Sequence, residues 1–131
     1  MRILGIDYGA SRVGLALGDT ETKIATPWSV VPNEGARALL SRIHDVVTRE
    51  EVSKIVVGVP RSLRERKNAS QQAQDIEAFV EELKQLGVPV NTEDEVMSSA
   101  LAARQAQEMG EKGKRDDLAA AVILQSWLDR Q

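Results

Sequence analysis

Three groups of carboxylates in this chain of 131 residues have the positions and types that could do chemistry. One is a single aspartate at the end of an apolar segment near the N-terminus, where a charge is costly unless it lies at a sheet edge or binds something. The second is a run of three acidic residues where a strand pattern meets a helix pattern, and the third is a pair that opens the last helical segment. In chain order these residues are Asp7, Glu93, Asp94, Glu95, Asp116 and Asp117. Taken singly, each group also fits an ordinary turn, helix-dipole or N-cap role.

Converging carboxylates without histidine or thiolate suit Mg²⁺ or Mn²⁺, which prefer oxygen ligands. The chain has no cysteine, and its single histidine is His44. Thiolate nucleophiles, zinc–thiolate sites and iron–sulfur clusters are therefore excluded, and a Ser–His–Asp triad is disfavoured. Two divalent ions about 4 Å apart can activate water and stabilise the leaving oxygen in phosphodiester hydrolysis. If the fold brings the three groups together, metal-assisted hydrolysis is the chemistry they predict.

Two basic segments could hold a phosphate backbone beside such a centre. One follows an apolar segment in the middle of the chain, and the other directly precedes the last pair of aspartates. Their basic residues are Arg61, Arg64, Arg66, Lys67, Lys112, Lys114 and Arg115. Solvated surface loops have the same composition, so this signal is not specific. Because aromatic residues make up only 3% of the chain, we expect Trp28 and Trp127 to pack in the core and base stacking to contribute little to binding.

The elements that must position these residues follow from the period of the apolar residues. Strands are expected at 2–8, 12–19, 26–32, 54–60 and 88–94. Helices are expected at 34–51, 73–86, 98–109 and 116–128, with Asn33 as the N-cap of the first and Gly87 ending the second. This order predicts an α/β domain with a five-stranded mixed sheet, three antiparallel strands and then two crossover strands, flanked by helices on both faces. The RNase H-like fold has the same order of elements.

Composition places the chain among ordinary globular proteins. Hydrophobic residues account for 42% and charged residues for 28%, with a net charge of -3. Neither a linker nor an internal repeat is visible, so residues 1–131 are expected to form a single domain. Without a run of about 18 apolar residues or a signal-peptide pattern, we expect a cytoplasmic protein with no membrane partner.

Four segments resemble the YqgF/RuvX family of Holliday junction resolvases and pre-16S rRNA nucleases. They are GIDYGASRVGLAL at 5–17, VVGVP at 56–60, DEVMSSALA at 94–102 and GKRDDLAAAVILQSWLD at 113–129. The resemblance spans essentially the whole chain. It implies an RNase H-like fold and a metal-dependent endonuclease that acts on structured RNA, branched DNA or both.

Carried over residue by residue, the resemblance places Asp7, Glu95 and Asp116 as catalytic ligands of two Mg²⁺ or Mn²⁺ ions. Asp117 is an alternative ligand, because it follows Asp116 at the start of the same helical segment. The sequence departs from the family at Val96, where an Arg usually follows the Asp-Glu pair. The loop after VVGVP also lacks the customary Gly, which affects the expected substrate preference.

The resulting function is a nuclease that processes the 5′ end of precursor 16S rRNA. One alternative is a Holliday junction resolvase, which requires a homodimer because symmetric cleavage needs two active sites. Another is a non-catalytic nucleic-acid or ribosome-associated binding module with structural carboxylates. A third is an ATPase, since Asp7-x-Gly9 also resembles the phosphate loop of the actin and sugar-kinase ATPases, although those proteins enclose ATP between two such domains.

Overall fold

The computed structural model describes residues 1–59, 71–94 and 116–131, and of residues 71–73 and 116 it describes the backbone alone. Its strands are β1 (Arg2–Tyr8), β2 (Arg12–Asp19), β3 (Ile24–Pro32), β4 (Val52–Val59) and β5 (Val90–Asp94). Its helices are α1 (Ala36–Arg49), α3 (Gln71–Leu83) and α5 (Asp116–Asp129), with a short 3₁₀ turn, η1 (Lys84–Leu86), after α3. The helix expected at 98–109 lies outside the described residues.

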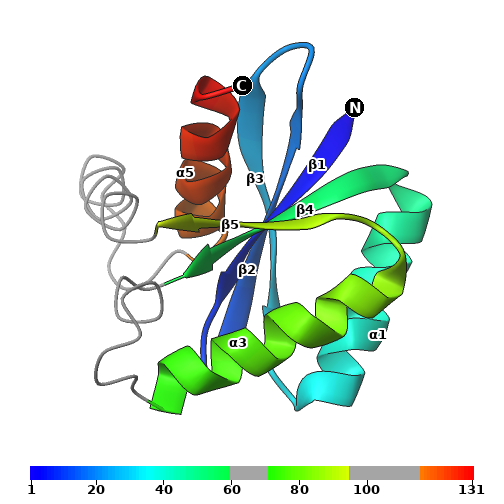
Figure 1. Ribbon diagram of the computed structural model, residues 1–131, viewed down its shortest axis with the longest axis vertical. Coiled ribbons are helices and arrows are strands. Elements are labelled where there is room, and N and C mark those ends of the chain that lie inside the picture. Colours follow the sequence, from blue (N-terminus) through cyan, green and yellow to red (C-terminus); the bar gives the residue numbers. More distant parts are fainter. Residues whose placement is uncertain (60–70, 95–115) are drawn as a thin grey trace.

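The five strands form one sheet in the order β3-β2-β1-β4-β5. The first three strands pair antiparallel, and β4 and β5 join them parallel to β1. Helix α5 covers one face of the sheet, and α1 and α3 cover the other (Figure 1). The mixed five-stranded sheet with helices on both faces is therefore confirmed. No helix in the described parts of the chain is long and apolar enough to cross a membrane.

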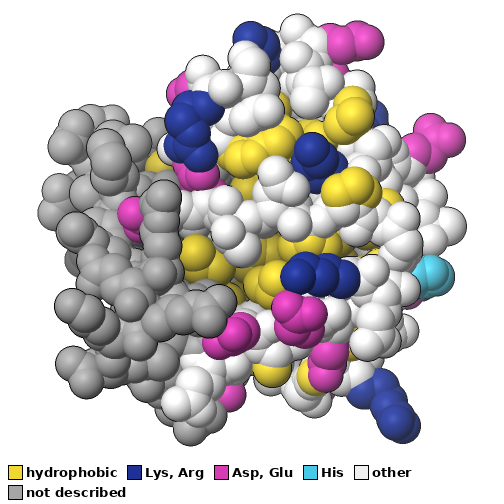
Figure 2. Space-filling view, viewed as in Figure 1, with side chains coloured by type: hydrophobic (Ala, Val, Ile, Leu, Met, Phe, Trp, Pro, Cys, Tyr) yellow, Lys and Arg dark blue, Asp and Glu magenta, His cyan; other side chains and the backbone are white. Residues whose placement is uncertain are grey.

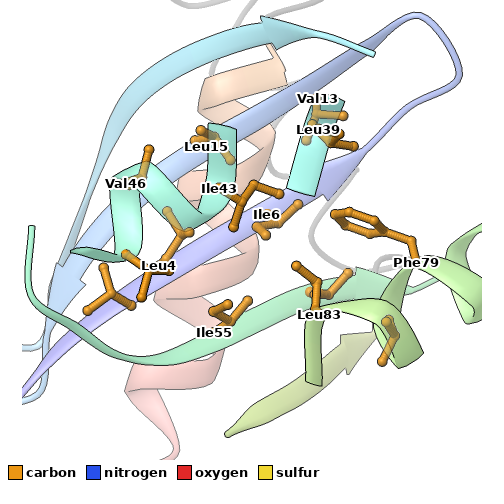
Figure 3. Packing of buried hydrophobic residues seen from close by; sticks show 14 of the residues in the cluster. Leu4, Ile6, Val13, Leu15, Leu39, Ile43, Val46, Ile55, Phe79 and Leu83 are labelled. Atoms are coloured by element: carbon orange, nitrogen blue, oxygen red, sulfur yellow. The ribbon is translucent and has the colours of Figure 1, made fainter. Parts of the chain in front are cut away.

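The larger core lies between the sheet and the pair α1 and α3 (Figure 3). Strand β1 contributes Leu4 and Ile6, which are fully buried, because alternate residues of a strand face the same side. Helix α3 contributes Phe79, whose ring centroid lies 4.9 Å from that of Tyr8 at the end of β1. The core is mainly aliphatic, and it packs against one side of β1.

The second core, under α5, depends on a close approach between helix and sheet. A Cβ atom on Gly5 would lie 2.8 Å from the Leu124 Cβ and 3.1 Å from the Ala120 carbonyl oxygen. A Cβ atom on Gly58 would overlap the Ile123 Cδ1. Glycine on β1 and β4 thus lets α5 pack directly on the strand backbones, which fixes the helix against the sheet.

Two residue-level expectations were wrong. Asn33 does not cap α1, whose N-cap is Gly35 with no side-chain cap bond. The Asn33 Nδ2 instead donates to the Gly9 carbonyl at 2.8 Å and so braces the turn between β1 and β2. Trp28 is 40% exposed on the edge strand β3, whereas Trp127 is buried as expected. Gly87 ends the helical segment as predicted, with a left-handed φ of 86°.

Candidate functional site

Asp7 lies at the carboxyl end of β1, on the sheet face that α5 covers. Ile3 belongs to the core under α5, and strand alternation gives Gly5 and Asp7 the same face. The antiparallel register pairs Asp7 with Gly14 of β2. On the other side, β4 follows β1 up to the pair Ile6–Val57, and the next residue of β4 is Gly58. The half-buried Asp7 thus has a glycine beside it on each neighbouring strand.

Helix α5 begins at the same end of the sheet as Asp7. Gly5, nearer the carboxyl end of β1, faces Ala120 and Leu124 of the helix. Gly18 is level with Ile3, nearer the amino end of β1, and it faces Leu124 and Leu128. Helix α5 therefore runs in the direction opposite to β1. Asp7 is two residues beyond Gly5, about 6.6 Å along the strand. Asp116 is four residues before Ala120, about 6 Å along the helix and on the same helix face. The fold therefore brings the first residue of α5 level with Asp7.

Asp117, the alternative candidate, is half-buried in the first turn of α5. Its Oδ1 accepts a hydrogen bond from the Leu118 backbone N–H at 2.9 Å. A carboxylate in the first turn also interacts favourably with the positive end of the helix dipole. Asp117 therefore has a local structural role.

Strand β5 ends at this edge too. It runs parallel to β4 with Gly58 paired to Glu93 and Val59 paired to Asp94. Because β1, β4 and β5 are parallel, their carboxyl ends share one edge of the sheet. Glu95, the next residue, lies outside the described residues, as do all seven basic residues expected to bind nucleic acid.

Glu93 and Asp94, the two described residues of the acidic run, do not form one cluster. Glu93 is 4% exposed and is the one buried charged side chain in the described parts of the chain. Its partner is Arg130, just past α5, which donates from Nη1 to the Glu93 Oε2 at 2.5 Å and from Nη2 to Oε1. Asp94 pairs with Val59, whose side chain belongs to the opposite core, so it faces the other side of the sheet. Glu93 is therefore neutralised within the protein.

Sequence reasoning missed Arg130 because its partner lies 37 residues away in the chain. The hydrogen bond to Glu93 raises the pKa of the Arg130 guanidinium, so Arg130 keeps its positive charge at every pH near neutrality. The signal available in the sequence was the alternation of β5, which puts Glu93 and Asp94 on opposite faces.

The described residues fit part of a metal site. Asp7 offers carboxylate oxygens at a strand end, and the backbone positions of Asp116 and Asp94 lie at the same edge. The described residues alone contain no cluster of three His, Cys, Asp or Glu side chains that could hold an ion. On the face shown in Figure 2, basic and acidic side chains are interspersed, so the charges described there form no patch of one sign.

Comparison with known proteins places this geometry in a family. Residues 1–130 match the family described as RuvX: Holliday junction resolvase. A relative from Anaeromyxobacter sp. (strain Fw109-5), provisionally named a pre-16S rRNA nuclease, is 42% identical, and the match covers 98% of this chain and 97% of the relative.

Solved structures show the fold. The chain is similar to Thermus thermophilus RuvC in complex with a Holliday junction substrate, with a TM-score of 0.65, 19% identity, and coverage of 99% of this chain and 94% of that one. It is also similar to a ROK hexokinase from Thermus thermophilus, with a TM-score of 0.53 and 24% identity, covering 80% of this chain and 39% of the kinase. The kinase likeness concerns the fold alone. The full-length family match and the high identity of the relative show that the chain belongs to the RuvX (YqgF) family, and it has the RNase H-like fold of RuvC.

Proposed function

We propose that this protein is a metal-dependent nuclease that hydrolyses phosphodiester bonds in structured nucleic acid, acting in 5′-end processing of precursor 16S rRNA. The observation that carries the proposal is the meeting of Asp7, the start of α5 and the end of β5 at one edge of the sheet. Membership of the RuvX family and the name of the Anaeromyxobacter relative support it.

The proposed ligands of Mg²⁺ or Mn²⁺ are Asp7, Glu95 and Asp116, with Asp117 as the alternative at the helix start. The ions would supply positive charge and water activation at the scissile phosphate. Two ions are expected, because three carboxylates concentrate enough negative charge to offset both in part. Asp7 suits its role because α3 packs on one side of β1 and α5 on the other, which limits movement of the strand end.

The protein's remaining contribution is to hold the nucleic acid. The proposed phosphate contacts come from the two basic segments, namely Arg61, Arg64, Arg66, Lys67, Lys112, Lys114 and Arg115. Lys112 to Arg115 directly precede Asp116 in the chain, which favours contacts with phosphates next to the reacting one. Val96 offers no cation at the position where the family usually has Arg, so we assign the phosphate contacts to these two segments.

The second candidate function is resolution of four-way DNA junctions, which the description of the matched family favours. Symmetric resolution requires two active sites and hence a homodimer. RNA end maturation does not. The two functions therefore differ in the oligomeric state of the active protein as well as in its substrate.

The experiment compares cleavage of labelled precursor 16S rRNA and of a four-way DNA junction with Mn²⁺, by the wild type and by Asp7→Asn. We expect RNA cleavage that Asp7→Asn abolishes, while Asp45→Asn, an exposed carboxylate on α1, retains it. Symmetric cuts in the junction alone would instead assign the resolvase function. Absence of cleavage of both substrates, with nucleic-acid binding retained in EDTA, would overturn the nuclease proposal in favour of a binding module.

A further inference from the structure

We infer that Trp28 is a stacking platform for an unpaired base of the nucleic acid, an inference that rests on the proposed nuclease function. The chain has four aromatic residues, two Trp, one Tyr and one Phe. Phe79 and Trp127 are buried and Tyr8 is half-buried, but Trp28 is 40% exposed. Its neighbour on the same strand, Val30, is 41% exposed. An exposed indole in so aromatic-poor a chain is the feature that needs an explanation.

The position of Trp28 connects it with the candidate site. Val31 packs on the core under α1 and α3, so Val30 faces the α5 side of the sheet. The register pairs Val30 with Gly14, and Gly14 with Asp7, so these three residues form one row across β3, β2 and β1. Two strand spacings separate the ends of this row, about 10 Å.

A β-bulge sets the place of Trp28 next to that row. Ser29 lies opposite Leu15 and Pro27 opposite Ala16, so Trp28 is the extra residue of β3. It is two residues from Val30, which puts its backbone about 12 Å from that of Asp7. A nucleic-acid strand with one phosphate at Asp7 would therefore place a nearby nucleotide within reach of Trp28.

The edge strand itself argues against another protein strand as the occupant. Pro27 and Pro32 both lie in β3, and neither has a backbone N–H to donate. Together with the bulge, they make this edge a poor template for strand addition.

Charge on the neighbouring strand also favours a nucleotide. Arg12 of β2 is exposed and pairs with Pro32, and alternation puts it on the face of Gly14 and Ala16, which α5 covers. An exposed indole on β3 and an exposed guanidinium on β2 thus both lie near the strand end that carries Asp7. A nucleic-acid base can stack on the indole, and its phosphate can pair with the guanidinium.

Fluorescence tests the inference because the two tryptophans have opposite environments. The protein carries Asp7→Asn, which prevents cleavage. A mixed-sequence single-stranded RNA oligonucleotide is added to it while Trp emission is recorded. In a separate experiment, binding is followed by the fluorescence anisotropy of the labelled RNA. We expect RNA to quench the emission. With Trp28→Leu added, the remaining Trp127 emission stays unchanged and binding weakens about tenfold. Trp28→Phe, which can still stack, should bind within about threefold of the parent.

Ile24→Ala is the matched control. Ile24 is 61% exposed on the same strand but pairs with Asp19, at the end far from Asp7, and its loss should leave binding unchanged. If RNA leaves the emission of the protein that retains Trp28 unaltered, and the Trp28→Leu variant binds RNA with equal affinity, the stacking role is overturned while the nuclease function stands. If the emission changes with protein concentration and not with added RNA, the surface around Trp28 binds a second copy of the chain, and the stacking role is overturned. Loss of both RNA binding and wild-type cleavage would end the inference together with the proposed function.

Discussion

Replacing Arg130 with glutamine leaves the Glu93 carboxylate buried without its cation. Glu93 is 4% exposed and Arg130 is 59% exposed, so the two partners pay different costs when they are separated. Removing one partner of a fully buried pair costs about 3–5 kcal/mol because a buried charge is left alone. Since the guanidinium side of this pair is at the surface, where water screens it, we expect Arg130→Gln to lower the free energy of unfolding by about 2 kcal/mol. For a domain of this size that is a fall in Tm of about 6–8 °C.

The opposite variant should be milder. Glu93→Gln removes the buried charge and leaves Arg130 in water, so we expect a loss of about 1 kcal/mol. The double variant should be close to Glu93→Gln alone, which means that Glu93→Gln rescues part of the Arg130→Gln defect. The assay is urea unfolding followed by far-ultraviolet circular dichroism, with comparison of midpoints at equal m-values.

Arg42→Gln provides the control. Arg42 lies 3.7 Å from Glu34, and both side chains are more than half exposed, so its loss should cost less than about 0.5 kcal/mol. The reasoning would be refuted if Arg130→Gln cost no more than Arg42→Gln, or if Glu93→Gln destabilised the protein as much as Arg130→Gln does.

Two further predictions concern glycines. Gly5→Ala should lower the free energy of unfolding by about 2–3 kcal/mol, because the new methyl meets the Leu124 Cβ and the Ala120 backbone oxygen. Gly58→Ala should lower it by only about 1 kcal/mol, because its methyl meets the movable end of the Ile123 side chain. Equal losses of the two variants in urea unfolding would contradict this reasoning. Gly87→Ala should cost about 1 kcal/mol despite open space around it, because its φ of 86° strains any other L residue, and a neutral result in thermal unfolding would show that the turn relaxes.

The elements whose apolar residues follow a clear pattern along the chain were predictable from the sequence. Strands β1 and β2 have the predicted bounds because their apolar runs end at a turn. The place of Asp7 at a strand end followed from the same pattern. Trp28 stays exposed because β3 is an edge strand, as Pro27 and Pro32 in its sequence indicate, and a large side chain on such a strand need not be buried.

Contacts between distant segments were not predictable. The pairing of Glu93 with Arg130 depends on how α5 crosses the sheet, which follows from the glycines beneath it and not from local pattern. Asn33 is of a residue type that often caps helices, but its side chain donates a hydrogen bond to the Gly9 carbonyl instead. The assignment of Glu95 and of the basic segments stays a prediction.

The central claim is that Asp7 holds a divalent ion at the carboxyl edge of the sheet, and Mn²⁺ binding measured by isothermal titration calorimetry tests it most directly. We expect Asp7→Asn to bind Mn²⁺ at least about tenfold more weakly than the wild type, since loss of a mere supporting residue already costs that much at metal sites. Its circular dichroism spectrum should be unchanged, and Asp45→Asn should bind as the wild type does. Unchanged Mn²⁺ affinity in a folded Asp7→Asn variant would contradict the account.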